Sequence, residues 1–381
     1  MPAAQPLPET LQRRYFVHRL GERRASSYNQ TLLIPLMRMK NGHKDESLNA
    51  RLARIVEAFP RVTIAVLGDL VADEFVFGEI SRVSREAPVL ILKHRERTVV
   101  PGGGGNAICN LAALDVNVLP VGVVGDDEPG RLLLQHFRQK HIPMGGIIKV
   151  KGHTTVTKTR ILAGMTHTTR QQIVRVDREP EDEGLDRHSV RELIMAARQY
   201  VRAADALLIS DYGYGAASPE ILNAIRSRGS LNGMPVTLDS RFRMLEYDGI
   251  TAATPNEPEV EEALGIRIGS DDAVLQKAGQ SLLQRMQLES LVITRGRDGM
   301  VAFAKRQKPA YIPIHGSDQI ADVTGAGDTV IAVFTAALAA GADAESAARL
   351  ANVAGGIVVM KRGTATASRQ ELLSALHQKA G

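Results

Sequence analysis

The strongest constraint on the fold is a series of short apolar runs that alternate with helical patterns along the chain. "VTIAVLGD" (62–69) is the first run, and it ends in Gly-Asp, as is typical of a buried parallel strand that feeds a loop. Further buried strands are predicted at 118–125, 206–210, 235–239, 249–254 and 290–296. Helices are predicted at 48–59, 106–114, 128–140, 187–202, 218–228, 256–264, 271–287, 328–341 and 344–363. This alternation predicts an α/β fold with a doubly wound, mostly parallel sheet flanked by helices.

Three β-rich segments break the alternation. They are "VLILKHRERTVV" (89–100), "TTVTKTRIL" (154–162) and "QQIVRVDRE" (171–179), with a plausible turn between the last two. We expect them to form a small sheet that projects from the main one. The alternative is that they are edge strands of the main sheet.

Composition narrows the class of protein. The 381-residue chain is 44% hydrophobic and 23% charged, which fits a globular protein with a sizeable core. Its single cysteine, Cys109, excludes an intramolecular disulfide. The sequence has no run of eighteen apolar residues and no secretory signal. We therefore expect a cytoplasmic protein that does not span a membrane.

Residues 1–47 mix Pro, Arg, Ser and Asn without sustained periodicity, and we interpret them as a basic N-terminal arm ahead of a domain over 48–381. Much of the excess positive charge behind the net +5 lies in the first sixty residues. A phosphorylated small molecule or a weak polyanion contact would both fit this charge. The arm lacks interleaved aromatic residues and any nucleic-acid motif, so a nucleic-acid partner is not expected.

The first candidate site is "TGAGD" (324–328), which precedes an apolar helix. Its small residues leave backbone N–H groups bare at a helix start, where an anion such as a phosphoryl group binds readily. Asp328 could act as a catalytic base there. It could equally be a helix cap, because Asp is a favoured residue at that position.

A second glycine cluster, "PGGGGN" (101–106), also precedes a helix. Bare backbone lets a ligand approach closely, and Asn106 offers both a donor and an acceptor. The cluster is not the dinucleotide-binding fingerprint, and no P-loop motif occurs anywhere in the chain. The alternative interpretation is a flexible surface turn.

Together these stretches resemble the ribokinase-like carbohydrate kinases, often called the PfkB family. The resemblance runs from about residue 61 to 375 and rests on the Gly-Gly-x-x-Asn cluster and "DVTGAGDT" (322–329). Four further stretches follow in the family's order: "VGVVGDDEPG" (121–130), "SDYGYG" (210–215), "TPNEPEVEEALG" (254–265) and "VITRGRDGMVAF" (292–303). The resemblance implies an enzyme that transfers a phosphoryl group from ATP, with Mg²⁺, to a sugar hydroxyl.

The resemblance also implies the site residues. Asp328 would deprotonate the acceptor hydroxyl, and the backbone of Gly325, Ala326 and Gly327 would hold the phosphoryl charge. Asn256 and Glu259 would organise the water network between Mg²⁺ and phosphate, with Glu259 reaching the metal through water. Nucleotide contacts would come from Thr294, Gly296 and Asn352, and acceptor contacts from Asp69, Asp73, Gly103, Gly104 and Asn106. The alternatives are helix capping for the Asn256/Glu259 pair and a solvated loop for Asp69 and Asp73.

Finer detail is similar to the D-glycero-D-manno-heptose 7-phosphate kinase branch, the kinase part of a bifunctional heptose kinase/adenylyltransferase. "GDLVADEFVFGEISRVSREAPVLIL" (68–92), "SDYGYGA" (210–216) and "GTATASRQEL" (363–372) carry this similarity. The branch implies that Arg82, Arg85, Lys158 and Arg160 bind a second phosphate already on the substrate, unless they are solvated surface residues. The chain departs from the branch at "GGGGN" and at "DSR" (239–241), and it lacks the H-x-G-H signature of the nucleotidyltransferase domain.

We therefore expect transfer of the ATP γ-phosphate to O1 of D-glycero-D-manno-heptose 7-phosphate, giving the 1,7-bisphosphate for lipopolysaccharide synthesis. A lid formed by about 74–100 and 154–178 would close over the site and pair with that of a second copy in a homodimer. The alternatives are a kinase of the same fold for another sugar, sugar phosphate or nucleoside, and a catalytically silent ligand-binding or regulatory protein.

Overall fold

The computed structural model describes residues 47–377, apart from 165–170, 181–183, 227–230, 232 and 317–321. The predicted N-terminal arm lies outside these residues, except for Ser47. Within the described part, Asn49 onward belongs to one compact unit. None of the described helices is long and apolar enough to cross a membrane.

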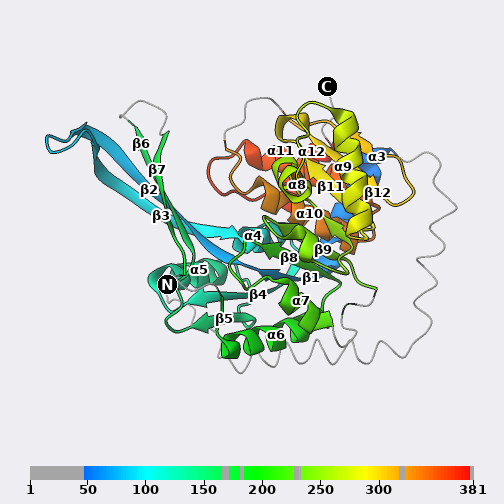
Figure 1. The fold of residues 1–381 in the computed structure, drawn as a ribbon, viewed down its shortest axis with the longest axis horizontal. Helices are drawn as coiled ribbons and strands as arrows, with labels where there is room; N and C mark the ends of the chain where they lie inside the picture. The colour runs from blue at the N-terminus through cyan, green and yellow to red at the C-terminus, as the bar shows by residue number, and fades with distance from the viewer. Residues whose placement is uncertain are drawn as a thin grey trace, which may run out of the picture. The chain divides into compact units, whose positions relative to one another are not determined.

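Two sheets make up the β-structure, and the larger one has nine strands in the order β13-β12-β11-β10-β9-β8-β1-β4-β5 (Figure 1). All neighbours from β5 to β11 pair in parallel, and only β12 and β13 are antiparallel. The strands are β1 (Thr63–Gly68), β4 (Asn117–Gly125), β5 (Ile147–Val150), β8 (Ala206–Asp211), β9 (Val236–Ser240), β10 (Ala252–Ala253), β11 (Ser290–Thr294), β12 (Met300–Ala304) and β13 (Ala310–Ile312). The predicted fold class is confirmed.

Helices flank this sheet. They are α3 (Leu48–Ala58), α4 (Gly104–Ala113), α5 (Glu128–Gln139), α6 (Arg187–Val201), α7 (Pro219–Arg226), α8 (Glu257–Leu264), α9 (Asp272–Arg285), α10 (Ala326–Ala339), α11 (Ala344–Val359) and α12 (Arg369–His377), with short 3₁₀ turns at Phe59–Arg61, Met244–Glu246 and Gly296–Asp298. Helix α10 contacts α4, α11, β8 and β9, whereas α6 contacts β1, β4 and β5. Because α10 is apolar on all sides, it is buried along most of its length, from Asp328 to Ala337.

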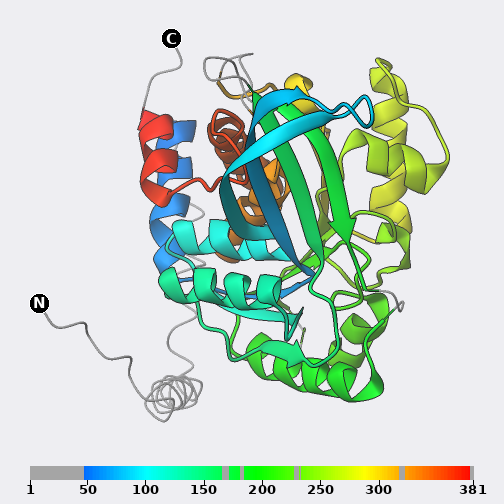
Figure 2. The same cartoon turned by 90° about the vertical axis from the view of Figure 1, so that its left-hand side faces the viewer.

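The smaller sheet, called the lid here, has four strands in the order β3-β2-β6-β7. They are β2 (Leu70–Val83), β3 (Leu90–Gly103), β6 (Thr157–Gly164) and β7 (Gln171–Arg178). Figures 1 and 2 show that these long, twisted strands extend away from the main sheet. The prediction of a separate projecting sheet is confirmed, and the edge-strand alternative is wrong.

Two strand predictions need correction. We expected a loop after "VTIAVLGD", but β2 begins at Leu70, directly after the first strand, and runs for 14 residues. The run "GITAAT" was expected to form a full strand, but only Ala252 and Ala253 pair, with β9 and β11. The main sheet is thus continuous through a very short central strand.

Candidate active site

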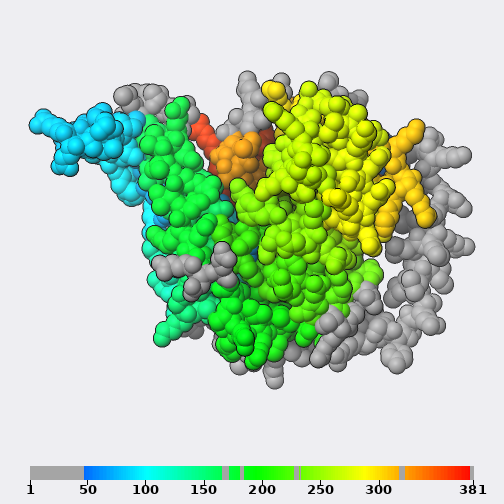
Figure 3. All heavy atoms as spheres, in the orientation of Figure 1, coloured from blue at the N-terminus to red at the C-terminus, as the bar shows by residue number. Residues whose placement is uncertain are grey.

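The candidate site lies where several parallel strands end. Asp69 follows β1, Tyr212 follows β8 and Arg241 follows β9, and the carboxyl ends of parallel strands meet at one edge of a sheet. A cavity of about 470 Å³ opens there, and Asp328, at the start of α10, lines it. Figure 3 shows the surface hollowed between the green lid strands and the yellow-green region that holds α8, with orange atoms of the α10 region between them.

Asp328 is only 2% exposed and accepts two side-chain hydrogen bonds. The Asn106 amide donates to Oδ2 at 2.9 Å, and the Tyr212 hydroxyl donates to Oδ1 at 2.9 Å. Asn106 also donates to the Gly325 carbonyl at 3.2 Å. Residues from α4, from the end of β8 and from α10 therefore fix the orientation of one carboxylate.

The surroundings of Asp328 shift the pKa of its carboxyl group to near neutral pH. Burial raises the pKa of Asp328 to about 7, while the hydrogen bonds from Asn106 and Tyr212 oppose this rise. The carboxylate of Asp73 raises the pKa of Asp328, and the ammonium of Lys158 lowers it. A carboxyl group with a pKa near the working pH can accept a proton and release it again, as a general base must.

A buried polar chain holds Asn106 in turn. Asn110, one helical turn later on α4, donates to the Asn106 side-chain oxygen at 3.1 Å. Asn110 accepts from the Thr329 hydroxyl at 3.0 Å, next to the candidate base. These bonds determine which end of the Asn106 amide faces Asp328, since its oxygen is engaged on the other side.

The start of α10 offers free amides to an anion. Gly325 has φ of 76°, and a Cβ there would lie 2.4 Å from Asn106 Nδ2, so this position requires glycine. The predicted anion hole changes in detail, because the Ala326 amide donates to the Val323 carbonyl at 3.2 Å. The amides of Gly327 and Asp328 donate to no other described residue. These two amides are free to donate hydrogen bonds to phosphoryl oxygens.

Asp73, which we predicted to contact the acceptor, lies on β2. Its Oδ1 accepts from Arg160 at 2.5 Å, and its Oδ2 accepts from the Thr364 hydroxyl at 3.2 Å. A Cβ at Gly102 would lie 2.3 Å from Oδ2, so the glycine cluster leaves room for this carboxylate. Gly103, with φ of 55°, and Gly104 continue the bare backbone into α4.

Lys158 lies beside Asp73, because the two residues are register partners on β6 and β2. Its ammonium is 5.2 Å from the ring centre of Tyr212 and 5.6 Å from that of Tyr214. The residue is only 6% exposed, and no described carboxylate forms an ion pair with it. Burial lowers the pKa of Lys158 and the positive charges of Arg175 and Arg241 lower it further, whereas the carboxylates of Asp73 and Asp177 raise it. A buried ammonium in this position suits an anionic ligand.

The carboxylate of Asp69 accepts hydrogen bonds from the backbone of a loop. Its two carboxylate oxygens accept four backbone N–H bonds of 2.8–3.2 Å, from residues 212, 214, 216 and 217. Four acceptances fill the lone pairs of a carboxylate. Asp69 therefore anchors the "YGYGAA" loop that carries Tyr212. Each oxygen of Asp73 accepts one side-chain hydrogen bond, and its contact with an acceptor stays a prediction.

The structure does not bring Arg82 and Arg85 to this cavity. Arg82 lies near the far end of β2 and Arg85 in the turn that follows, and both are exposed. Nine residues separate Arg82 from Asp73, and an extended strand rises about 3.3 Å per residue, so about 30 Å of strand lies between them. Lys158 and Arg160 are the members of the predicted cationic set that lie near Asp73.

The nucleotide side begins with α8. Asn256 caps this helix, accepting from the Glu259 amide at 2.9 Å, while Glu259 accepts from the Asn256 amide at 2.9 Å. The reciprocal pair is a capping box, so the capping interpretation holds. Both residues also line the cavity, together with Thr294 at the end of β11. Capping therefore orients Glu259 without removing it from the site.

Two predicted nucleotide residues do not line this cavity. Gly296 begins the 3₁₀ turn after β11, with φ of 55° and open space where a side chain would be. The Asn352 amide on α11 donates to the Pro313 carbonyl at 2.8 Å and holds the segment after β13. Their contacts with a nucleotide stay predictions.

A pair of carboxylates on the nucleotide side fits a magnesium ion. Burial raises the pKa of Asp239 well above its usual range, and the nearby Glu259 raises it further. No described residue donates a hydrogen bond to the Asp239 carboxylate. The described residues include no group of three His, Cys, Asp or Glu side chains that would enclose a metal. This arrangement suits Mg²⁺, which keeps several waters and binds through one or two carboxylates plus substrate phosphates.

Sequence reasoning missed Tyr212, Asn110 and Asp239 as site residues. Asn110 had a usable signal, since Asn106 and Asn110 are four residues apart and so share a helix face. Tyr212 and Asp239 had none beyond their positions at the carboxyl ends of predicted strands.

The fold and site define a class of protein. A buried carboxylate beside free amides at a helix start, over an open α/β sheet, is the arrangement of an enzyme that transfers a phosphoryl group to a hydroxyl group. The chain belongs to the pfkB family of carbohydrate kinases, whose model matches residues 64–371.

Comparisons with individual proteins agree with this family. The chain is 39% identical over 316 residues to the bifunctional protein HldE of Geobacter sulfurreducens (strain ATCC 51573 / DSM 12127 / PCA), covering 83% of this chain and 63% of that protein. It is 37% identical over 328 residues to HldE of Caulobacter sp. (strain K31), covering 86% and 65%. The chain thus spans less than two thirds of the length of these relatives.

Solved structures share the fold. Arabidopsis thaliana ribokinase complexed with ribose and ATP matches with a TM-score of 0.64 and 19% identity, over 83% of this chain and 99% of that one. Phosphofructokinase-2 from Escherichia coli in complex with fructose-6-phosphate matches with a TM-score of 0.65 and 17% identity, over 83% and 98%. At these identities the likeness shows the ribokinase-like fold.

Proposed function

We propose that this sugar kinase transfers the γ-phosphate of ATP to O1 of D-glycero-D-manno-heptose 7-phosphate, giving heptose 1,7-bisphosphate. The observation that carries the acceptor assignment is Lys158, a buried ammonium with no described carboxylate partner, beside Asp73. An acceptor that already bears a phosphate would add negative charge next to this ammonium, beside that of Asp73 and Asp177. The HldE relatives and the motif resemblance to the heptose branch support the same choice.

The site residues have distinct roles in this proposal. Asp73 and Asn106 orient the acceptor, and Asp328 takes the proton of its reacting hydroxyl. The acceptor oxygen forms a bond to the γ-phosphorus, the bond from that phosphorus to the β-bridging oxygen breaks, and the electron pair leaves with ADP. The free amides of Gly327 and Asp328 hold the charge on the transferring oxygens.

Asp239 and Glu259 are the residues that would hold Mg²⁺, with water completing its shell. When bound, Mg²⁺ would neutralise phosphate charge in a cavity that five acidic residues line. Closure of the lid would exclude water from the site and so limit transfer of the phosphoryl group to water.

The acceptor assignment is tested by measuring ADP release with a panel of sugars and sugar phosphates. Heptose 7-phosphate is expected to give the highest kcat/KM. Replacing Lys158 with Met keeps its apolar stem and removes its charge. This change should lower kcat/KM by about 10- to 100-fold for phosphorylated acceptors and leave the unphosphorylated sugars nearly unchanged. A preference for an unphosphorylated sugar would refute the acceptor, and no turnover with any acceptor would refute the kinase.

A further inference from the structure

The lining of the cavity that holds Asp328 has more acidic than basic side chains. Five acidic residues line it, one of them, Asp211, paired with Arg243, and Arg241 is the one cationic side chain among its described lining residues. The acidic residues are Asp211, Asp239, Glu259, Glu262 and Asp328. A nucleoside triphosphate such as ATP would bring further negative charge to this cavity. A divalent ion held by Asp239 and Glu259 would offset part of this charge, and Arg241 is the cationic side chain that also lines the cavity.

The backbone on both sides of Arg241 is firmly held. The Arg241 amide donates to the Asp211 carbonyl at 3.0 Å, and the Ser240 hydroxyl donates to the Asp211 carboxylate at 2.9 Å. Arg243 uses its guanidinium on that same carboxylate, at 2.9 Å. The two arginines of this loop therefore differ. The Arg243 guanidinium is paired with Asp211, whereas the Arg241 guanidinium forms no ion pair with a described residue.

The Arg241 guanidinium has no ion pair with any described residue. It lies 5.4 Å from the ring centre of Phe242, which is exposed and also lines the cavity. Arg241 lines the same cavity as Glu259 and Asp328, and after burial its positive charge is among the causes that lower the pKa of Lys158. Arg241 thus shares the cavity with Asp328 and with Asn256 and Glu259, the residues predicted to organise the nucleotide phosphates.

We propose that Arg241 is a catalytic residue that contacts the oxygens of the γ-phosphate through its guanidinium as the phosphoryl group moves to the acceptor. This inference rests on the proposed phosphotransfer. The planar guanidinium has parallel N–H groups that match two phosphate oxygens, and the charge on those oxygens is what the enzyme must stabilise during transfer. In this proposal the free amides of Gly327 and Asp328, which line the same cavity, donate to the same oxygens.

The proposal separates two roles that Arg241 could have. If Arg241 only offsets the negative charge of the acidic side chains, Arg241→Lys should keep the wild-type affinities, and Arg241→Ala should weaken the binding of all nucleotides equally. If Arg241 contacts the γ-phosphate, Arg241→Ala should weaken the binding only of nucleotides that carry this phosphate. Lysine, which lacks the paired N–H donors of the guanidinium, should then restore only part of the affinity.

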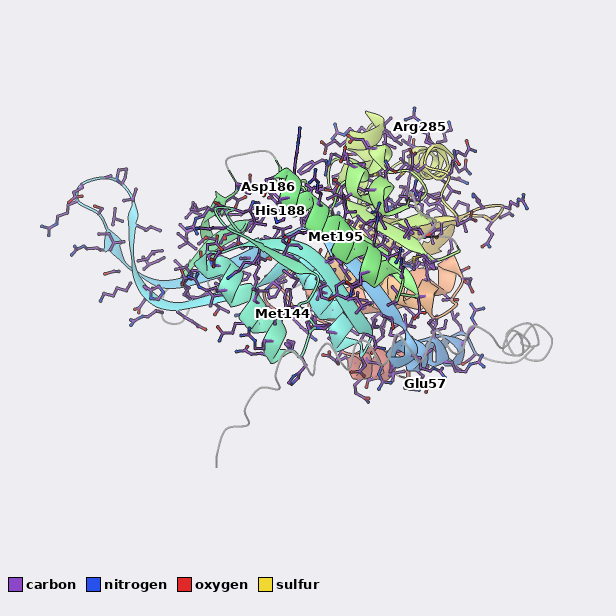
Figure 4. All side chains as sticks on the ribbon, turned by 90° about the horizontal axis from the view of Figure 1, so that it is seen from below. Glu57, Met144, Asp186, His188, Met195 and Arg285 are labelled. Atoms are coloured by element: carbon purple, nitrogen blue, oxygen red, sulfur yellow. The ribbon has the colours of Figure 1, made fainter. Side chains whose placement is uncertain are left out.

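The experiment measures binding of AMP-PNP, ADP and AMP, with Mg²⁺ present, to the full-length protein and three variants. Arg241→Ala should weaken AMP-PNP by about 10- to 100-fold, ADP much less and AMP within about twofold. Arg241→Lys should be intermediate for AMP-PNP. Arg285→Ala, which removes an exposed arginine at the end of α9 (Figure 4), controls for net charge and should change none of the three affinities.

A kinetic measurement completes the test. Arg241→Ala should lower kcat by about 10²- to 10³-fold, as removal of a preorganised donor does, and added guanidinium ion should restore part of the loss. Equal weakening of all three nucleotides, or wild-type AMP-PNP affinity in Arg241→Ala, would overturn the proposal. Wild-type protein that binds no nucleotide would instead overturn the kinase function. An unexpected acceptor in the turnover panel would affect only the heptose assignment.

Discussion

Asp328 combines deep burial with hydrogen bonds from Asn106 and Tyr212, and burial has the larger effect on its pKa. Replacing Asp328 with Asn removes the proton acceptor while nearly conserving volume. We expect kcat to fall by about 10²- to 10⁴-fold, the usual contribution of a positioned general base. ADP release at saturating acceptor measures this, with thermal melting as a control for folding. Activity within tenfold of the wild type would mean that another group accepts the proton.

The same carboxylate sets an expected pH dependence. With a pKa of about 7, Asp328 is protonated and inactive as a base at lower pH. The value of kcat/KM for the acceptor should therefore rise about tenfold per pH unit up to about pH 7 and level off above it.

Tyr212 tunes that profile. Its hydroxyl stabilises the Asp328 carboxylate, so Tyr212→Phe should raise the pKa of Asp328 and move the rising limb to higher pH, by roughly half to one pH unit. Tyr214→Phe is the matched control, because the Tyr214 hydroxyl donates to Glu179 instead. A limb that stays in place in Tyr212→Phe, or moves equally in both variants, would contradict this role.

At the scale of elements, one buried carboxylate holds the loop between β8 and α7. Burial raises the pKa of Asp69 to about 6, although four backbone amides donate to it. In Asp69→Asn an amide group would face N–H donors. We expect the free energy of unfolding to fall by ~2–4 kcal/mol at pH 8, measured by chemical denaturation.

The control for this loss of stability is Asp186, a helix cap that asparagine can replace. Asp186 caps α6 at an exposed position, labelled in Figure 4, and Asn caps helices about as well as Asp. Asp186→Asn should change stability by less than about 0.5 kcal/mol. A similar small change in Asp69→Asn would show that the loop does not depend on this carboxylate.

The elements differ in how far the sequence predicts them, and the reason is physical. Strands β1, β4, β8 and β11 are buried on both faces and therefore are continuous apolar runs. Residues 74–83 were expected in the lid, but β2 was not predicted as a strand of its own, because its buried residues include Asp73 and Glu74, and polar side chains required by a site break the apolar pattern.

The site shows the same division. The glycine clusters and Asp328 carry strong local signals, because bare backbone at a helix start has few other uses. The partners that orient Asp328 come from distant parts of the chain, 222 residues away for Asn106 and 116 for Tyr212. Their meeting depends on the strand order of the sheet, which short-range sequence patterns do not specify. The position of Arg82, far along a hairpin, likewise depends on the length of β2.

At the scale of the whole molecule, the lid leaves apolar side chains uncovered. Ile173, Val174 and Val176 on β7 and Val83 and Leu90 at the hairpin end are all more than 40% exposed. These side chains lie at two places on the lid, the β7 edge and the end of the β2–β3 hairpin, and exposed apolar side chains that gather on a sheet mark interaction surfaces. We propose that a second copy of the chain covers them in a homodimer, with a mass twice the 41.2 kDa of one chain.

A charged residue on β7 tests this proposal. Val176→Lys places an ammonium where the partner lid would pack, and a buried unpaired charge disfavours association strongly. Sedimentation should show two-chain particles for the wild type and single chains for the variant at micromolar concentration. Met195→Lys changes an equally exposed apolar residue on α6, away from the lid (Figure 4), and should leave the dimer intact. Single chains in the wild type would refute the dimer. Dissociation by the Met195 change alone would place the interface on α6, outside the lid.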